Sequence, residues 1–223
     1  MHNEWLLILA SLSDIFLVFT AARFGTKRLY GTIAINLILI SIFGAKLVTL
    51  FGYTTNVGNI FYACVFLATY FILERHDKKD AFRTIWFGII CLTFFIVLSQ
   101  LAVHFTSAVP GDSLDAATRT VFKLSIRIAL ASALSYMFAQ YVNILIYSWI
   151  KSKTGERFLW LRANVANICG QIVDCSLFFT IGFVDLPGNA LVQAILAGLV
   201  IRTLVVVIGT PFIYIDRYVL ARK

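Results

Sequence analysis

The chain has 223 residues, of which 60% are hydrophobic and only 13% are charged, and its mean hydropathy is +0.88. About a quarter of the residues of a soluble domain are charged, so this composition excludes a soluble globular protein and indicates a compact polytopic membrane protein. The net charge of +8 is carried by short basic clusters between apolar runs, which is typical of topology signals and does not predict a nucleic-acid partner.

Seven apolar runs are long enough to cross a bilayer, whose hydrocarbon core requires about 20 residues of helix. They cover residues 4–21, 31–51, 58–74, 83–104, 124–150, 162–183 and 189–215. Runs of this length without alternation exclude a transmembrane β-barrel. The sequence therefore predicts an all-α integral membrane protein of the cell membrane, with about seven transmembrane helices in one bundle.

Most of the 19 basic residues lie in every second loop. They are Arg23, Lys27 and Arg28; Arg75, Lys78, Lys79 and Arg83; Lys151, Lys153, Arg157 and Arg162; and Arg217, Arg222 and Lys223. The intervening loops 52–57 and 184–188 have no basic residue. Because cytoplasmic loops are enriched in Lys and Arg, the N-terminus is predicted outside and the C-terminus in the cytoplasm.

The cysteines and histidines of the chain form no enzymatic or metal-binding motif. The four cysteines, Cys64, Cys91, Cys169 and Cys175, fall inside apolar runs without Cys-x-x-Cys or Cys/His metal spacing. Neither Gly-x-Ser-x-Gly nor His-Glu-x-x-His occurs, and the three histidines lie at ends and in loops. We therefore expect no enzyme activity, no bound metal and no cofactor.

Five charged residues lie inside the predicted spans, where a charge at the helix centre costs about 2.5–3.5 kcal/mol or more. Lys46 and Arg127 are near the outer ends and can snorkel to the interface. Asp14, Asp174 and Arg202 are near mid-span, which indicates a functional site or an internal ion pair. Arg202 is the candidate partner of either Asp174 or Asp14.

Two neighbouring apolar segments between 123 and 185 repeat one polar pattern. Gln140 and Asn143 lie three residues apart, as do Gln171 and Asp174, so each pair occupies one helical face. The two helices are predicted to be antiparallel neighbours joined by a short basic loop, which gives both pairs a similar depth. If the two faces meet, four polar side chains cluster near the midplane and form a small-molecule site.

Aromatic surface from Tyr136 and Phe178 is expected near this cluster. The structural alternative is that Gln140 and Gln171 simply join helices through hydrogen bonds, worth about 0.6 kcal/mol each. Asp174 is poorly suited to that role because an ionised carboxylate is expensive in a membrane. A carboxylate and carboxamides instead suit the hydrogen-bonding edge of a planar heterocycle such as a purine, whose faces can stack on aromatic rings.

Several motifs in order carry a resemblance to a known family. They are Phe66-Leu-Ala-Thr69, Arg127 with Ala131-Ser132, Gln140, Trp160-Leu-Arg162, Gln171-x-x-Asp174 with Phe178, and Thr210-Pro211-x-x-Tyr214. On these motifs, the region from Gly44 to Tyr218 resembles the queuosine-precursor transporters, a vitamin-uptake-transporter-like family of bacteria and archaea. Tyr70, Asn143 and Arg202 stand where that family often has Asp, Asp and Lys.

The resemblance implies a six-helix carrier for 7-deazaguanines, such as 7-cyano-7-deazaguanine, that feed tRNA modification. It divides the chain into an extra N-terminal transmembrane helix with a basic loop, 1–29, and a six-helix transporter core, 30–223. The expected site residues, from pattern and resemblance together, are Asp174, Gln171, Gln140, Asn143, Arg127, Arg202, Tyr136 and Phe178. Asp174 would accept two adjacent N–H groups of the deazaguanine.

Two further alternatives remain open. The chain is either an importer of a queuosine or archaeosine precursor or the substrate-binding membrane subunit of an energised uptake system for a vitamin or nucleobase. Homo-oligomerisation and an energising partner are both compatible with the sequence. Asp14 is either a proton carrier or a structural partner of Arg202.

Overall fold

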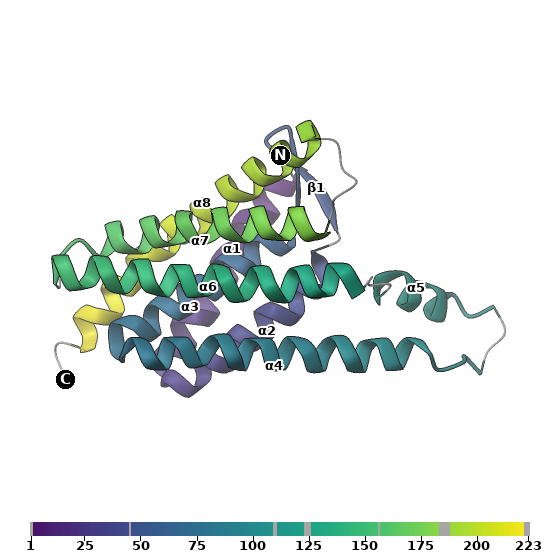
Figure 1. Cartoon of the computed structure of the whole chain (residues 1–223), viewed down its shortest axis with the longest axis horizontal. Helices are drawn as coiled ribbons and strands as arrows, with labels where there is room; N and C mark the ends of the chain where they lie inside the picture. Colours follow the sequence, from purple (N-terminus) through teal and green to yellow (C-terminus); the bar gives the residue numbers. More distant parts are fainter. Residues whose placement is uncertain are drawn as a thin grey trace.

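The fold was analysed in a computed structural model, which describes residues 2–44, 46–108, 111–122, 126–155, 157–182 and 188–220. The elements in chain order are α1 (His2–Arg23), α2 (Thr26–Phe43), β1 (Leu47–Leu50), β2 (Tyr53–Asn56), α3 (Gly58–Arg75), α4 (Lys78–Val103), α5 (Ser113–Phe122), α6 (Ile126–Thr154), α7 (Leu159–Gly182) and α8 (Gly188–Leu220). The long helices run along one direction and form a single bundle (Figure 1).

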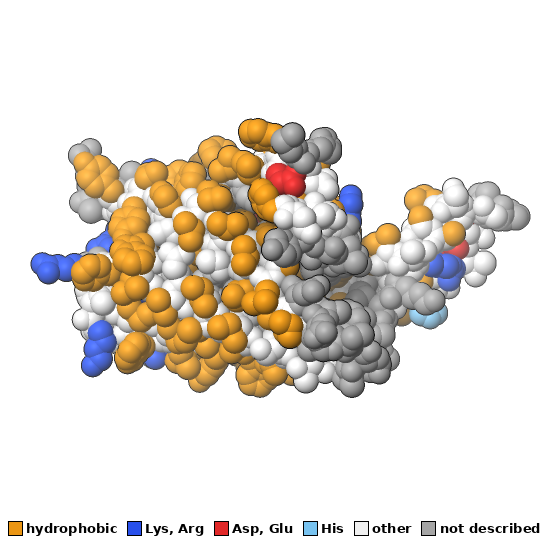
Figure 2. Space-filling view, turned by 90° about the horizontal axis from the view of Figure 1, so that it is seen from above, with side chains coloured by type: hydrophobic (Ala, Val, Ile, Leu, Met, Phe, Trp, Pro, Cys, Tyr) orange, Lys and Arg blue, Asp and Glu red, His pale blue; other side chains and the backbone are white. Residues whose placement is uncertain are grey.

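Six of the helices in the described ranges are long and apolar enough to cross a membrane: α1, α2, α4, α6, α7 and α8. Their outer faces expose large apolar side chains such as Trp86, Phe94 and Leu98, and apolar side chains cover much of the visible surface of the bundle (Figure 2). Such a surface fits a lipid environment rather than water. The expectation of a multi-pass membrane protein agrees with this surface.

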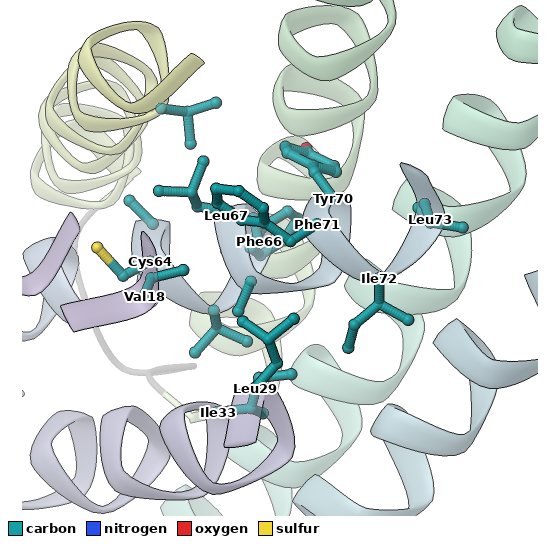
Figure 3. Close-up of a cluster of buried hydrophobic side chains, with 14 of the residues drawn as sticks. Val18, Leu29, Ile33, Cys64, Phe66, Leu67, Tyr70, Phe71, Ile72 and Leu73 are labelled. Carbon is teal, nitrogen blue, oxygen red and sulfur yellow. The ribbon is translucent and has the colours of Figure 1, made fainter. Parts of the chain in front are cut away.

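The predicted run 58–74 forms α3, which lies in the middle of the bundle and is not one of those six helices. Nearly every side chain from Gly58 to Leu73 is buried. Figure 3 shows side chains of α3, among them Leu67 and Tyr70, surrounded by neighbouring helices. On the α8 side, Leu67 fits against Gly209, where an added Cβ would lie 2.8 Å from Leu67 Cδ2. The prediction of seven membrane spans is therefore untested at α3.

The predicted span 31–51 is wrong at both ends. The helix α2 covers Thr26–Phe43, and a β-hairpin follows it. Both turn residues of the hairpin have a positive φ, 50° at Phe51 and 82° at Gly52, which is the geometry of the tight turns that favour Gly. Lys46 consequently lies between helix and hairpin and is exposed, not inside a membrane span.

The predicted loop 105–123 contains the helix α5, which has no buried residue and extends beyond the bundle (Figure 1). Asp112 accepts a hydrogen bond from the backbone N–H of Leu114 at the start of this helix (2.9 Å), as helix-capping residues do. Arg119 forms an ion pair with Asp115 one turn earlier (2.7 Å). The hydrogen bond to the Asp115 carboxylate raises the pKa of Arg119 above its ordinary value.

Basic side chains gather at one end of the bundle. Figure 2 shows most of the visible Lys and Arg at the end where α6 joins α7 and where the C-terminus lies in Figure 1. The β-hairpin, the N-terminus and α5 lie toward the opposite end (Figure 1). This polarity matches the charge pattern of the loops, and the assignment of the basic end to the cytoplasm remains a prediction.

Candidate functional site

A buried guanidinium joins three helices in the middle of the bundle. Arg202 of α8 forms an ion pair with Asp174 of α7, with 2.6 Å between Nη1 and Oδ2. The same nitrogen donates to Oε1 of Gln171 at 2.6 Å, and Nε donates to Oδ1 of Asn59 on α3 at 2.6 Å. Of the two partners considered for Arg202, the structure therefore selects Asp174 over Asp14.

Tyr62 of α3 completes the coordination of the carboxylate. Its hydroxyl donates to the second carboxylate oxygen of Asp174 at 2.5 Å, and its ring lies 4.3 Å from the guanidinium carbon of Arg202. A cation over an aromatic face is favourable, and more so when both are removed from water. Both carboxylate oxygens thus have charged or polar partners, which offsets the cost of burying the pair.

Amide side chains extend this cluster in two directions. Asn59 Nδ2 donates to Oγ1 of Thr55 on β2 at 2.8 Å, which links the cluster to the hairpin. Gln171 Nε2 donates to Oδ1 of Asn167 at 3.3 Å, one turn along α7. We name Asn59, Tyr62, Asn167, Gln171, Asp174 and Arg202 the arginine cluster.

A second polar group lies between α3 and α6. The hydroxyl of Tyr70 donates to Oδ1 of Asn143 at 2.8 Å, and Asn143 Nδ2 donates to Oε1 of Gln140 at 3.3 Å. Within the part of the chain that the structure describes, two buried amide nitrogens have no hydrogen-bond partner, Nε2 of Gln140 and Nδ2 of Asn167. Buried amide groups normally find hydrogen-bond partners, so these two donors are candidates for contacts with a ligand.

Close packing brings the two polar groups together. A Cβ placed on Gly170 of α7 would lie 3.1 Å from Cβ of Asn143 on α6 and 2.8 Å from Cε1 of Phe66 on α3. The predicted contact between the α6 and α7 faces is present. The hydrogen bonds, however, divide the four expected side chains, because Gln140 and Asn143 bond each other and Gln171 bonds the arginine.

The remaining expected site residues are located differently. Tyr136 is buried against α4, where its hydroxyl donates to the backbone oxygen of Thr84 (3.4 Å), so its hydroxyl contact belongs to the packing of α4 rather than to the arginine cluster. Phe178 is half-buried, with its ring 5.4 Å from that of Phe179. The side chain of Arg127 lies outside the described residues.

A separate charged group occupies the C-terminal end of α3. Glu74 accepts two hydrogen bonds from Nη2 of Arg162 on α7, at 2.8 and 2.7 Å, and one from the hydroxyl of Tyr147 on α6 at 2.8 Å. Lys151 of α6 lies 3.3 Å from the same carboxylate. Arg162 is completely buried, so Glu74 supplies the counter-charge that this position requires.

The next residue of α3 binds two other helices. Arg75 Nε donates to Asp216 of α8 at 2.9 Å, its Nη2 donates to the other oxygen of the same carboxylate, and its Nη1 donates to the backbone oxygen of Ala22 on α1. We refer to Glu74, Arg75 and these partners as the charged clamp. It ties α3 to α1, α6, α7 and α8 at the basic end of the bundle.

Three residues of α3 that contact the site were missing from the sequence-based expectation. Asn59, Tyr62 and Tyr70 belong to the predicted span 58–74, and none of the three was among the expected site residues. Their spacing carried a signal, because with Phe66 they recur every three to four residues and therefore share one helical face. The conclusion that this face turns toward Asp174 and Asn143 required the arrangement of the helices.

A groove of about 560 Å³ opens elsewhere on the molecule. It is lined by Thr26, Lys27, Tyr30, Gly31, His76, Asp80 and Phe87. None of these residues belongs to the arginine cluster or the charged clamp, so the groove is a different feature from the candidate site.

Comparisons with known proteins give two matches. A family model described as "Putative vitamin uptake transporter" matches residues 56–215. The chain is 26% identical over 215 residues to a protein of Bacillus subtilis (strain 168) named "Probable queuosine precursor transporter", an alignment that covers 96% of this chain and 93% of that protein. No solved structure matches the chain.

Proposed function

We propose, from the premise that this chain belongs to the vitamin uptake transporter family, that it imports a 7-deazaguanine precursor of queuosine or archaeosine. The chain is a multi-pass membrane transporter and not an enzyme, as the family and the six apolar helices indicate. The identity of the substrate is the proposed part, and it is supported by the name of the Bacillus subtilis relative together with the chemistry of the arginine cluster.

The observation that carries the proposal is the buried pair of Arg202 and Asp174. A guanine-type edge presents one carbonyl acceptor beside two N–H donors. The pair offers the complementary set, because a guanidinium only donates hydrogen bonds and a carboxylate only accepts them. A deazaguanine could therefore exchange the internal ion pair for two sets of charge-assisted hydrogen bonds.

The surrounding residues suit the rest of such a ligand. Tyr62 and Phe66 present neighbouring aromatic rings, with centroids 5.4 Å apart, on which a planar heterocycle can stack. The unpartnered amide donors of Gln140 and Asn167 can bond acceptors of the ligand, such as the nitrogen of a cyano group. The site would thus recognise the guanine-type edge through the charged pair, and the rest of the ligand through aromatic stacking and hydrogen bonds from the amides.

The decisive experiment is complementation of a precursor-auxotrophic cell at low external precursor. The intact protein should restore modified tRNA, and Asp174→Ala should abolish this because the main acceptor for the ligand edge is removed. The half-buried carboxylate of Asp115 on α5, which lies outside the bundle, provides a control, since Asp115→Ala should transport normally. Undiminished modification with a normally expressed Asp174→Ala protein would refute the assignment.

A milder variant covers the case in which Asp174→Ala fails to fold. Tyr62→Phe keeps the ring and removes only the hydroxyl that bonds Asp174. A hydrogen bond to a charged group contributes about 1.5–3 kcal/mol. Loss of the bond that holds Asp174 should therefore weaken precursor affinity by roughly ten-fold or more. Binding of a 7-deazaguanine to the purified protein, compared with guanine and riboflavin, measures this affinity directly and tests a binding-subunit role without requiring transport.

A further inference from the structure

A second buried carboxylate lies away from the arginine cluster, between α1 and α2. Asp14, in the middle of α1, is 7% exposed, and its Oδ1 accepts a hydrogen bond from Nδ2 of Asn36 at 3.2 Å. Asn36 is completely buried and donates its amide also to the backbone oxygen of Thr32. The NH2 group of Asn36 therefore points toward the carboxylate, and its Oδ1 atom is available for another partner.

Among the described residues, Oδ2 of Asp14, Oδ1 of Asn36 and Oγ of Ser11 are buried oxygen atoms without a hydrogen-bond partner. Ser11 is 2% exposed and precedes Asp14 by three residues, which places both on the same face of α1. Unsatisfied buried acceptors are rare because each carries a desolvation penalty. Such atoms on Asp14 itself, on its hydrogen-bonded neighbour Asn36 and on Ser11, one helical turn before Asp14, indicate a missing electrophilic partner.

No basic side chain of the described residues forms an ion pair with Asp14. On α8, which packs against α1, Arg202 bonds Asp174 and Asp216 bonds Arg75. The titratable group that faces Asp14 from α3 is the thiol of Cys64, a hydrogen-bond partner of the carboxylate, but a neutral thiol carries no charge that could balance it. A carboxylate at membrane depth nevertheless requires a positive charge or a proton.

We propose that Ser11, Asp14 and Asn36 bind a sodium ion. All three offer oxygen, the donor atom that hard cations prefer, and the single carboxylate balances one positive charge. Divalent ions normally take more carboxylates than this position supplies. A proton on Oδ2 would remove the charge of the carboxylate, whereas a sodium ion would balance that charge and can contact all three oxygen atoms at once.

Helix α3 lies between this position and the candidate substrate site. Cys64 faces Asp14, while Tyr62, two residues earlier, bonds Asp174. Residues two apart point to nearly opposite sides of a helix. If the protein transports as proposed above, sodium bound between α1 and α2 and substrate bound between α3, α7 and α8 would act on the same short helix, which makes sodium the candidate coupling ion.

Sodium binding can be tested without any substrate. Thermal unfolding of the purified full chain in detergent is compared in NaCl and in KCl at equal ionic strength and fixed pH. A ligand that binds only the folded state raises Tm, by about 3 °C for a protein of this size at a tenfold excess over Kd. We expect this rise in sodium for the intact protein and for the control Asp115→Asn, and no rise for Asp14→Asn.

Two further measurements keep the proposal falsifiable. Ser11→Ala removes one oxygen with little change in packing, and should raise the sodium concentration for half of the shift several-fold even if Asp14→Asn does not fold. Equal Tm in sodium and potassium would overturn the proposal, as would a sodium shift that persists in Asp14→Asn. Stabilisation at low pH without a sodium effect would identify a proton carrier instead and would equally overturn it.

Discussion

At the scale of single residues, Arg202 is held by more bonds than any other side chain of the arginine cluster. It contacts Asn59 of α3 and both Gln171 and Asp174 of α7, with 12% of its side chain exposed. Because both charges lose their hydration on burial, the ion pair with Asp174 contributes less to the stability of the folded protein than its short distances suggest. Removing only one partner costs much more stability, since the other charge then remains buried without a counter-charge.

This asymmetry gives a double-variant prediction. Arg202→Gln should destabilise the protein by about 3–5 kcal/mol, and the combined Arg202→Gln and Asp174→Asn variant should recover most of that loss while remaining unable to transport. Denaturant unfolding of the purified protein measures the free energies. The exposed pair of Arg83 and Asp80 supplies the control, because Arg83→Gln should change stability by about 1 kcal/mol or less. A single variant as stable as the intact protein would contradict the prediction.

The residues of the site differ in how far the sequence could reveal them. Asp174, Gln171 and Arg202 could be identified because charges and amides at membrane depth need a reason, and the structure brings these three into contact. Tyr62 and Tyr70 carried no such warning, since aromatic side chains are common in apolar helices. Asp14 could also be identified from its depth in the membrane span. Its partner Asn36 could not, because Asn36 lies on another helix. That Asp14 does not pair with Arg202 depends on helix packing, which local sequence does not encode.

At the scale of elements, the contact of α3, α6 and α7 depends on Gly170. A Cβ at this position would lie 2.8 Å from Cε1 of Phe66 and 3.1 Å from the backbone oxygen of Ala139, so the Phe66 ring or one of the helices would have to shift. Small residues at helix interfaces allow this kind of close approach in membranes. The same close approach brings the arginine cluster near the pair of Gln140 and Asn143.

Substitution of this glycine should therefore loosen the helix contact. Gly170→Ala is expected to be about 1–3 kcal/mol less stable than Gly31→Ala, because overpacking a filled interface forces side chains or backbone to shift. Gly31 is a matched control, since it also lies in a helix but has no atom within 4 Å of an added Cβ. Parallel unfolding measurements on the two variants provide the comparison, and equal stability would show that the interface can relax.

The elements themselves were predicted unevenly. The runs 83–104, 124–150, 162–183 and 189–215 correspond to α4, α6, α7 and α8 within a few residues, because long apolar segments leave little choice in a bilayer. The hairpin after α2 was missed because its first strand, β1, is apolar and continues the hydrophobic run of the helix. The helix α5 was missed because it is short and polar, and apolar length was the criterion for a helix.

At the scale of the whole molecule, the distribution of charge predicts the orientation in the membrane. The charged clamp and most of the basic loops lie at one end, and α5 extends from the other (Figures 1 and 2). Because positive loops are retained in the cytoplasm, the end with the clamp should face inward. The division of the chain at residue 29 is a prediction of the same kind, drawn from the sequence alone.

Labelling of single cysteines tests this orientation. In a background whose four native cysteines are replaced by alanine, Ser113→Cys on α5 should react in intact cells with a maleimide that cannot cross membranes. Ser152→Cys at the end of α6 should react only after permeabilisation. Both serines are exposed in the structure, so a lack of reaction reflects sidedness rather than burial. The reverse pattern would invert the topology.

The central position of α3 also has a consequence for how the protein is made. Its polar side chains find their partners late in the chain: Tyr70 bonds a residue 73 positions further on, Glu74 one 88 further, Tyr62 one 112 further and Arg75 one 141 further. When α3 leaves the ribosome, none of these partners has been synthesised. The bundle can therefore close around α3 only after α8 has entered the bilayer, so that assembly follows translation rather than accompanying it.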